Sequence, residues 1–160
     1  PPFSFQGEPV SSTLVRTALE AGDIGHAEAL LGRPWFVRGE IAHGDKRGRD
    51  LGYPTANMHL AHDCRLRFGI YAVRMKLDGG WRDGVASFGS RPTFDDGAPR
   101  LETFVFDFSG DLYGKTVDVA FVAFLRGEAK FDSLDALIGQ MDADSARARG
   151  ILAATPAFLP

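Results

Sequence analysis

The chain has 160 residues, of which 44% are hydrophobic and 24% are charged. This composition predicts one globular domain with an appendage and argues against a disordered chain. The 18 basic and 21 acidic residues give a formal net charge of -3, which disfavours a dedicated binder of nucleic acid or of anionic membranes. No apolar run approaches the roughly 20 residues of a transmembrane helix, and the single Cys64 excludes an intramolecular disulfide and fits a reducing compartment.

Residues 1–34 predict a short pair of helices. Ser12 is a suitable N-cap for a helix over Thr13–Ala21, and Asp23 is one for a second helix over Ile24–Leu31. A glycine follows each range, as is common where helices end. The apolar side chains of this pair are too few to form a core alone.

From Trp35 onward, apolar and polar residues alternate with the period of β-strands. Strands are expected over residues 35–43, Ile70–Leu77, Trp81–Phe88, Leu101–Phe108 and Thr116–Leu125. About six strands with short turns favour a closed antiparallel barrel, because closure removes exposed edges. The alternation by itself does not choose a barrel over a sandwich.

The last predicted element is an α-helix. Asp132 is a plausible N-cap. The spacing i, i+3, i+4, i+7 of one apolar helix face is shown by Leu134, Leu137, Ile138 and Met141. Such a helix can cover an opening of the barrel.

The stretch from His43 to Asn57 is the most unusual part of the sequence. It holds three glycines and three cations in its first ten residues, a combination that lets backbone N–H groups approach an anion while positive charge balances it. It lacks the Gly-Lys-Ser/Thr ending of a P-loop. A solvated, glycine-rich surface loop is the alternative interpretation.

Pro54-Thr55-Ala56-Asn57 closes that stretch. Thr55 and Asn57 are two residues apart, so on an extended strand their side-chain oxygens point the same way. Two neutral oxygens on one face suit Mg²⁺, which takes its other ligands from water and nucleotide phosphates. A turn capped by Thr and Asn hydrogen bonds is the alternative.

Glu102 is the candidate catalytic carboxylate. It shares one face of the predicted strand with Phe104, Phe106 and Phe108. A carboxylate in an aromatic row is either a residue at the end of the barrel that reaches solvent or a partly buried general base for a hydroxyl.

These residues resemble a known family. The segment 44–57, Gly-Asp-Lys-Arg-Gly-Arg-Asp-Leu-Gly-Tyr-Pro-Thr-Ala-Asn, closely resembles the signature of riboflavin kinases (flavokinases). The likeness continues in the family's order through residues 89–94, 101–108, 111–115, 124–126 and 131–134, and it covers about residues 33–151.

The resemblance implies a mainly β fold, a six-stranded antiparallel Greek-key barrel with a C-terminal α-helix. It implies transfer of the ATP γ-phosphoryl group to the 5′-hydroxyl of riboflavin, giving FMN and ADP. Thr55 and Asn57 would then ligate Mg²⁺, and Glu102 would accept the proton of the hydroxyl. Positioning and neutralisation of charge are what phosphoryl transfer mainly requires.

The resemblance also assigns binding residues. The nucleotide would be held by Gly44, Lys46, Gly48, Arg49, Gly52 and Pro54, with Tyr113 beside the adenine. The flavin side would include Arg126, Phe131, Leu134 and Met141.

Residues 1–34 resemble the end of an FMN adenylyltransferase module, the module that precedes the kinase in bacterial bifunctional FAD synthetases. The chain is therefore expected to comprise a helical remnant or linker over 1–34 and a riboflavin kinase domain over 35–160. Adenylyltransferase activity is not expected in it, and the enzyme would be cytoplasmic. A β-barrel that binds a flavin or a nucleotide without chemistry is the alternative.

Overall fold

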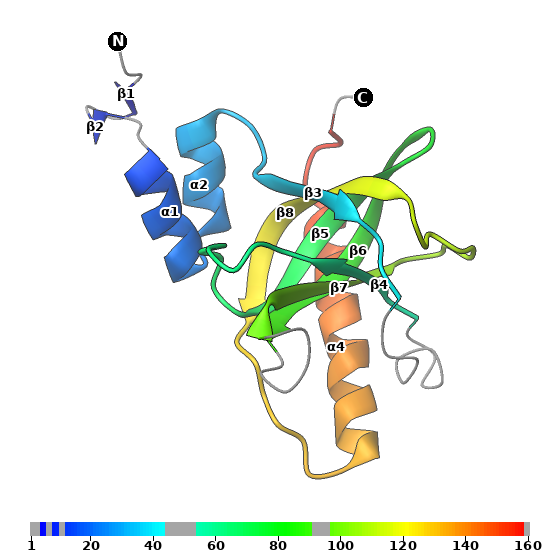
Figure 1. Cartoon of the computed structure of the whole chain (residues 1–160). Coiled ribbons are helices and arrows are strands. Elements are labelled where there is room, and N and C mark those ends of the chain that lie inside the picture. Colours follow the sequence, from blue (N-terminus) through cyan, green and yellow to red (C-terminus); the bar gives the residue numbers. More distant parts are fainter. Residues whose placement is uncertain (1–3, 6–7, 10–11, 44–53, 91–96, 159–160) are drawn as a thin grey trace.

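The computed structural model describes residues 4–5, 8–9, 12–43, 54–90 and 97–158 (Figure 1). The helices are α1 (Ser12–Ala21), α2 (Ile24–Leu31) and α4 (Leu134–Ala153). The strands of the main sheet are β3 (Phe36–Glu40), β4 (Ala56–His59), β5 (Gly69–Leu77), β6 (Gly80–Ser90), β7 (Pro99–Val105) and β8 (Thr116–Arg126). A two-stranded ribbon of β1 (Ser4–Phe5) and β2 (Glu8–Pro9) precedes them and was not expected from the sequence.

The main sheet is a Greek key. All its neighbouring strands are antiparallel, in the order β3-β8-β5-β6-β7-β4. β5, β6 and β7 are consecutive neighbours, and β8 returns to lie beside β5, which is the spatial order of a Greek key. The predicted six-stranded antiparallel barrel is therefore confirmed.

The barrel is nearly closed because its two outermost strands approach each other. Ala42, just after β3, forms a β-bridge with Asn57 of β4. Gly39 lies so close to Met58 that a Cβ atom there would stand 2.8 Å from the Met58 side chain. Glycine at this position lets β3 and β4 approach.

The interior of the barrel is filled by the side chains on one face of each strand. Large buried side chains there come from Tyr71, Phe88, Leu101 and Phe121. Tyr71 and Phe121 meet edge to face, with ring centroids 5.1 Å apart. The opposite side of the strands is the outer face, where the remaining elements pack.

The α1–α2 pair packs against the barrel. Asp23 caps α2 as predicted, accepting a hydrogen bond from the His26 N–H at 3.1 Å. Leu19 and Ile24 of the pair belong to the same buried cluster as Tyr71 of the barrel. The helices that were too small to form a core thus complete the barrel's core.

Helix α4 lies on the outer face against β5, β6 and β8, on a different side of the barrel from α1 and α2 (Figure 1). Its N-cap is Ser133, which accepts a hydrogen bond from the Ala136 N–H at 3.0 Å, so the prediction of Asp132 was wrong by one residue. At the other end, buried Arg74 of β5 donates to the carbonyls of Leu152 and Thr155 at 3.1 and 3.0 Å. These bonds satisfy carbonyls that a helix end leaves without partners.

Strand β7 is shorter than predicted. It ends at Val105, and the chain turns at Asp107, a non-glycine residue with φ of 53°. The Phe106 N–H bonds to the Asp83 carbonyl at 2.9 Å. The expected row of aromatic residues beside Glu102 continues past the strand end to Phe106, whose ring meets that of Phe104 edge to face with centroids 5.7 Å apart. Phe108 packs with the other buried cluster and is not part of the row.

No helix in the described ranges combines the length and the apolar composition that crossing a bilayer requires.

Candidate active site

A hollow of about 860 Å³ separates part of α4 from the outer face of the sheet. We call it the α4 hollow. Its lining includes Ile70, Val85 and Phe104 from the strands, Leu137 and Met141 from α4, and Phe131 from the segment between β8 and α4. These apolar and aromatic walls suit a ring-bearing ligand, and the volume is typical of small-molecule sites.

A row of side chains crosses the sheet along this hollow. In the strand pairing, Asn57 of β4 is opposite Glu102 of β7, which is opposite Ser87 of β6. Ser87 is in turn opposite Ile70 of β5, and Ile70 is opposite Arg126 of β8. Paired residues of antiparallel strands project from the same face, and neighbouring strands are about 4.8 Å apart. Glu102 and Arg126 are therefore about 14 Å apart along the sheet, at opposite ends of the hollow.

Glu102 is half-buried at one end of the hollow and makes an ion pair with a buried neighbour. Arg100, two residues earlier on the same face of β7, places Nη2 3.1 Å from the Glu102 Oε1 atom. The Arg100 side chain is only 10% exposed. A guanidinium in this position restricts the orientation of the carboxylate.

Thr55 and Asn57 lie at the same end of the hollow as Glu102. Thr55 lines the hollow, and Asn57 is directly opposite Glu102 in the register. The Asn57 Nδ2 atom donates to the Thr55 carbonyl at 3.5 Å, and within the described residues the buried Asn57 Oδ1 accepts no hydrogen bond. A buried amide oxygen that accepts no hydrogen bond suits a positively charged ligand such as Mg²⁺.

The other end of the hollow is built on an ion pair that the sequence did not reveal. Arg126 of β8 holds both carboxylate oxygens of Asp144 on α4, with its Nε at 3.0 and 3.2 Å and its Nη2 at 2.8 Å. Gln140 donates to the same carboxylate at 2.9 Å, and the guanidinium lies 5.8 Å from the centre of the Phe131 ring. Bidentate pairing of this kind ties α4 to the sheet.

Glycine at the start of β5 allows Arg126 to reach this position. Gly69 has φ of 156°, and a Cβ atom there would collide with the Arg126 carbonyl oxygen. Any other residue would push β5 away from the end of β8.

Other residues assigned from the resemblance have different positions. Phe131 and Met141 line the hollow, whereas Leu134 is 48% exposed and is not part of the lining. Tyr113 is also outside the hollow, exposed and stacked on His43 with ring centroids 3.6 Å apart. Pro54 is exposed. The assigned loop residues Gly44, Lys46, Gly48, Arg49 and Gly52 lie outside the described residues.

Sequence reasoning missed Arg100, Ser87, Asp144 and Ser145, which also line the hollow. Arg100 could have been found, because it lies two residues from Glu102 and therefore shares its strand face. Asp144 could not, because its pairing with Arg126 depends on where α4 packs.

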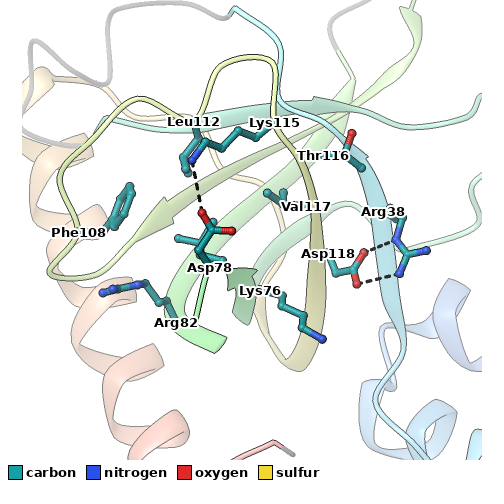
Figure 2. Close-up of a pocket in the computed structure, with 11 residues that line it drawn as sticks. Arg38, Lys76, Asp78, Arg82, Phe108, Leu112, Lys115, Thr116, Val117 and Asp118 are labelled. Atoms are coloured by element: carbon teal, nitrogen blue, oxygen red, sulfur yellow. Dashed lines mark hydrogen bonds and ion pairs between the residues drawn. The ribbon is translucent and has the colours of Figure 1, made fainter. Parts of the chain in front are cut away.

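A second hollow, of about 350 Å³, lies between β3, the β5–β6 hairpin and the segment that leads into β8 (Figure 2). We call it the charged hollow. Among the described residues it is lined by four cations and two carboxylates: Arg38, Lys76, Arg82, Lys115, Asp78 and Asp118.

Much of the charge in this second hollow is compensated. Arg38 donates to both oxygens of Asp118 at 2.6 and 3.1 Å, and this hydrogen bonding lowers the pKa of the Asp118 carboxyl. Lys115 approaches Asp78 at 3.9 Å, and Arg82 lies 5.4 Å from the centre of the Phe108 ring. These are contacts of an exposed polar rim.

Comparison with known proteins points to one family. The family model described as "Flavokinase: Riboflavin kinase" matches residues 31–152. A curated bifunctional riboflavin kinase/FMN adenylyltransferase of Pseudomonas fluorescens is 46% identical over 150 residues, covering 93% of this chain and 48% of that protein. The chain spans about half the length of the curated relatives it matches.

Two solved structures share the fold. A crystal structure titled as a macrolide-efflux protein from Streptococcus pneumoniae has a TM-score of 0.82 at 39% identity, covering 93% of this chain and 49% of that one. The crystal structure of riboflavin kinase from Trypanosoma brucei has a TM-score of 0.55 at 25% identity, covering 74% and 80% of the two chains.

Proposed function

This chain belongs to the riboflavin kinase family, and we propose that the α4 hollow is where it transfers the γ-phosphoryl group of ATP to the 5′-hydroxyl of riboflavin. The observation that carries the proposal is the row from Asn57 through Glu102 to Arg126. It combines a carboxylate and an unsatisfied oxygen at one end with an apolar, ring-sized space beyond. An elongated substrate with a reactive hydroxyl at one end and a flat ring at the other fits this order of groups.

Glu102 is the general base in this proposal. The riboflavin 5′-oxygen forms a bond to the γ-phosphorus, the bond from that phosphorus to the ADP oxygen breaks, and the hydroxyl proton passes to the Glu102 carboxylate. Arg100 holds that carboxylate from 3.1 Å away. Since Glu102 lies in β7, which is paired with a strand on each side, the base is positioned by rigid backbone, which favours a reproducible attack geometry.

Thr55 and Asn57 would hold Mg²⁺. The unsatisfied, buried Asn57 Oδ1 and the half-buried Thr55 are the neutral oxygens that fit this cation, which takes its other ligands from phosphates and water. When bound, the cation would neutralise charge on the phosphate oxygens.

The nucleotide would approach from the side of β4 on which Tyr113 lies. The exposed Tyr113 ring and its stacking partner His43 provide an aromatic surface suited to a base. His43 follows Ala42, which bridges to Asn57, so this surface is next to the proposed cation ligands. Pro54 and the loop residues Gly44, Lys46, Gly48, Arg49 and Gly52 would hold the phosphates.

The flavin ring would occupy the apolar part of the hollow. Phe131 and Met141 line it, and Arg126 closes its far end together with Asp144. Leu134, at the start of α4, would contact a bound flavin only at its margin, since it is half exposed.

The curated relatives suggest the setting of this activity. We propose that the chain is the C-terminal part of a bifunctional FAD synthetase, with 1–34 as the end of an adenylyltransferase module and 35–160 as the kinase domain. The adenylyltransferase reaction itself is not proposed for this chain. Use of ATP as co-substrate and the single cysteine favour a cytoplasmic enzyme.

The test is direct. The protein is incubated with riboflavin, ATP and Mg²⁺, and the flavins are separated by chromatography. Appearance of FMN, dependent on ATP and on the divalent cation, is expected. If riboflavin binds but no FMN forms with any divalent cation, the chain is a flavin-binding barrel without chemistry, and the proposal fails.

A further inference from the structure

One face of α4 is apolar except at two adjacent positions, Asp144 and Ser145. The stripe that faces the barrel and the α4 hollow runs through Leu137, Met141, Ser145, Ala148 and Leu152. These residues are three or four positions apart, as expected for one helix face. Ala148 and Leu152 pack on the sheet, while Leu137 and Met141 line the hollow. Ser145 lies at the boundary between these two parts.

The Ser145 hydroxyl is buried without a hydrogen bond. The residue is 8% exposed, and within the described ranges its Oγ atom has no hydrogen-bonding partner. A serine inside a helix can usually bond to a carbonyl of the preceding turn, but here it does not. A buried polar group without a hydrogen bond lowers the stability of the fold by about 1–3 kcal/mol. The presence of Ser145 in this stripe therefore needs an explanation other than stability.

The neighbouring polar groups already satisfy one another. Asp144, adjacent in sequence, is held by Arg126 and Gln140. All three are therefore engaged in a network that fixes the far end of the hollow. Ser145 lines the same hollow, and its hydroxyl is a donor and acceptor that these neighbours leave unused.

We propose that the Ser145 hydroxyl hydrogen-bonds a polar edge of the riboflavin ring and so determines specificity for a flavin over an apolar ring of similar size. This inference rests on the proposed function of the α4 hollow. Ser145 adjoins Asp144, the partner of Arg126, and Arg126 is about 14 Å from Glu102 along the sheet. With its 5′-hydroxyl at Glu102, riboflavin would bring its ring, not its ribityl hydroxyls, to this end. Of the two ends of that ring, only the pyrimidine end carries carbonyls that a hydroxyl can bond. A site that hydrogen-bonds a ligand's polar group discriminates against analogues without it.

The test compares Ser145→Ala with the wild-type protein by titration of flavin fluorescence. The two probes are riboflavin and lumiflavin, which carries the same ring without the ribityl chain. The variant is expected to bind both about 5- to 20-fold more weakly, because one hydrogen bond is lost, and to bind a non-hydrolysable ATP analogue normally. Ser109→Ala, on the exposed segment before β8, is the matched control and is expected to bind all three ligands like the wild type.

A second readout separates binding from structure. Without ligand, Ser145→Ala is expected to melt no lower than the wild type, because it removes an unsatisfied hydroxyl and alanine favours helix. Unchanged affinity for riboflavin, or a loss for riboflavin but not for lumiflavin, would overturn the assignment to the ring. A lower melting temperature with unchanged affinity would show a merely structural serine. Failure of the wild type to bind riboflavin at all would instead refute the proposed function.

Discussion

The α4 hollow and the charged hollow show two different ways in which polar groups gather on one barrel. The charged hollow has more charge, with four cations and two carboxylates among its described residues, but its closest groups neutralise each other at its exposed rim. The α4 hollow is larger and more apolar, and buried oxygens of Asn57 and Ser145 at its two ends have no hydrogen-bonding partner within the described residues. We therefore base the proposed ligand site on unsatisfied buried groups beside an apolar space rather than on the density of charge.

The difference has an energetic basis. Exposed ion pairs such as that of Arg38 and Asp118 contribute little and require no ligand. A buried oxygen without a hydrogen bond reduces stability until something binds it. Matched variants of the two hollows test this contrast through their activity, ligand affinity and stability.

The largest expected effect is on catalysis. Replacing Glu102 by Gln keeps the shape of the side chain but removes its capacity to accept the proton. We expect FMN formation to slow by about 10²- to 10⁴-fold, with binding of the ATP analogue retained. Asp118→Asn makes the same chemical change in the charged hollow and is expected to leave the rate unchanged. Equal rates for Glu102→Gln and the wild type would refute the assignment of the base.

The next effect is on stability. Asp144→Ala leaves the Arg126 guanidinium, 23% exposed, without its carboxylate, and we expect a loss of about 3 kcal/mol in the free energy of unfolding. Urea denaturation measures it. The matched change Asp118→Ala removes the partner of an exposed arginine and is expected to cost much less. Equal losses would show that the two ion pairs do not differ as described.

A smaller effect is expected on metal-dependent binding. Asn57→Ala removes the proposed cation ligand and should weaken binding of Mg·ADP by about 10-fold or more. Calorimetry with and without Mg²⁺ measures it. In the absence of Mg²⁺ the variant and the wild type should bind ADP alike; a loss of the same size there would mean that Asn57 acts on the nucleotide rather than on the cation.

The smallest effect concerns pH and the charged hollow. The hydrogen bonds from Arg38 lower the pKa of Asp118 below its ordinary value of 3.8. A lowered carboxyl pKa stabilises the folded state above that ordinary value, and the contribution disappears as the pH falls through the lowered pKa. The difference in stability between the wild type and Arg38→Met should therefore be small at neutral pH and vanish in strong acid. A difference that grew as the pH fell would have the wrong sign.

The sequence predicted the strands and helices well because alternation and capping are local signals. It extended the strand after Leu101 too far, because the turn at Asp107 depends on the bond from Phe106 to Asp83 of another strand. The N-cap of α4 is Ser133 and not the predicted Asp132, because either of these adjacent residues could accept the capping hydrogen bond.

The candidate site shows the same limit. Thr55, Asn57 and Glu102 could be proposed from the sequence, because their spacing puts them on strand faces and because they match a family signature. Asp144 and Ser145 could not be proposed, since each is near Arg126 or the hollow only through the packing of α4 on β5, β6 and β8. A residue that acts through long-range packing leaves no periodic or short-range pattern to read.

A crystal structure of the protein with riboflavin, ADP and Mg²⁺ tests the central claim most directly. The account predicts the flavin ring in the α4 hollow, between Phe104 and Met141, with the 5′-hydroxyl within hydrogen-bonding distance of Glu102 and the charged hollow without flavin. A ring bound in the charged hollow, or a hydroxyl remote from Glu102, would contradict it.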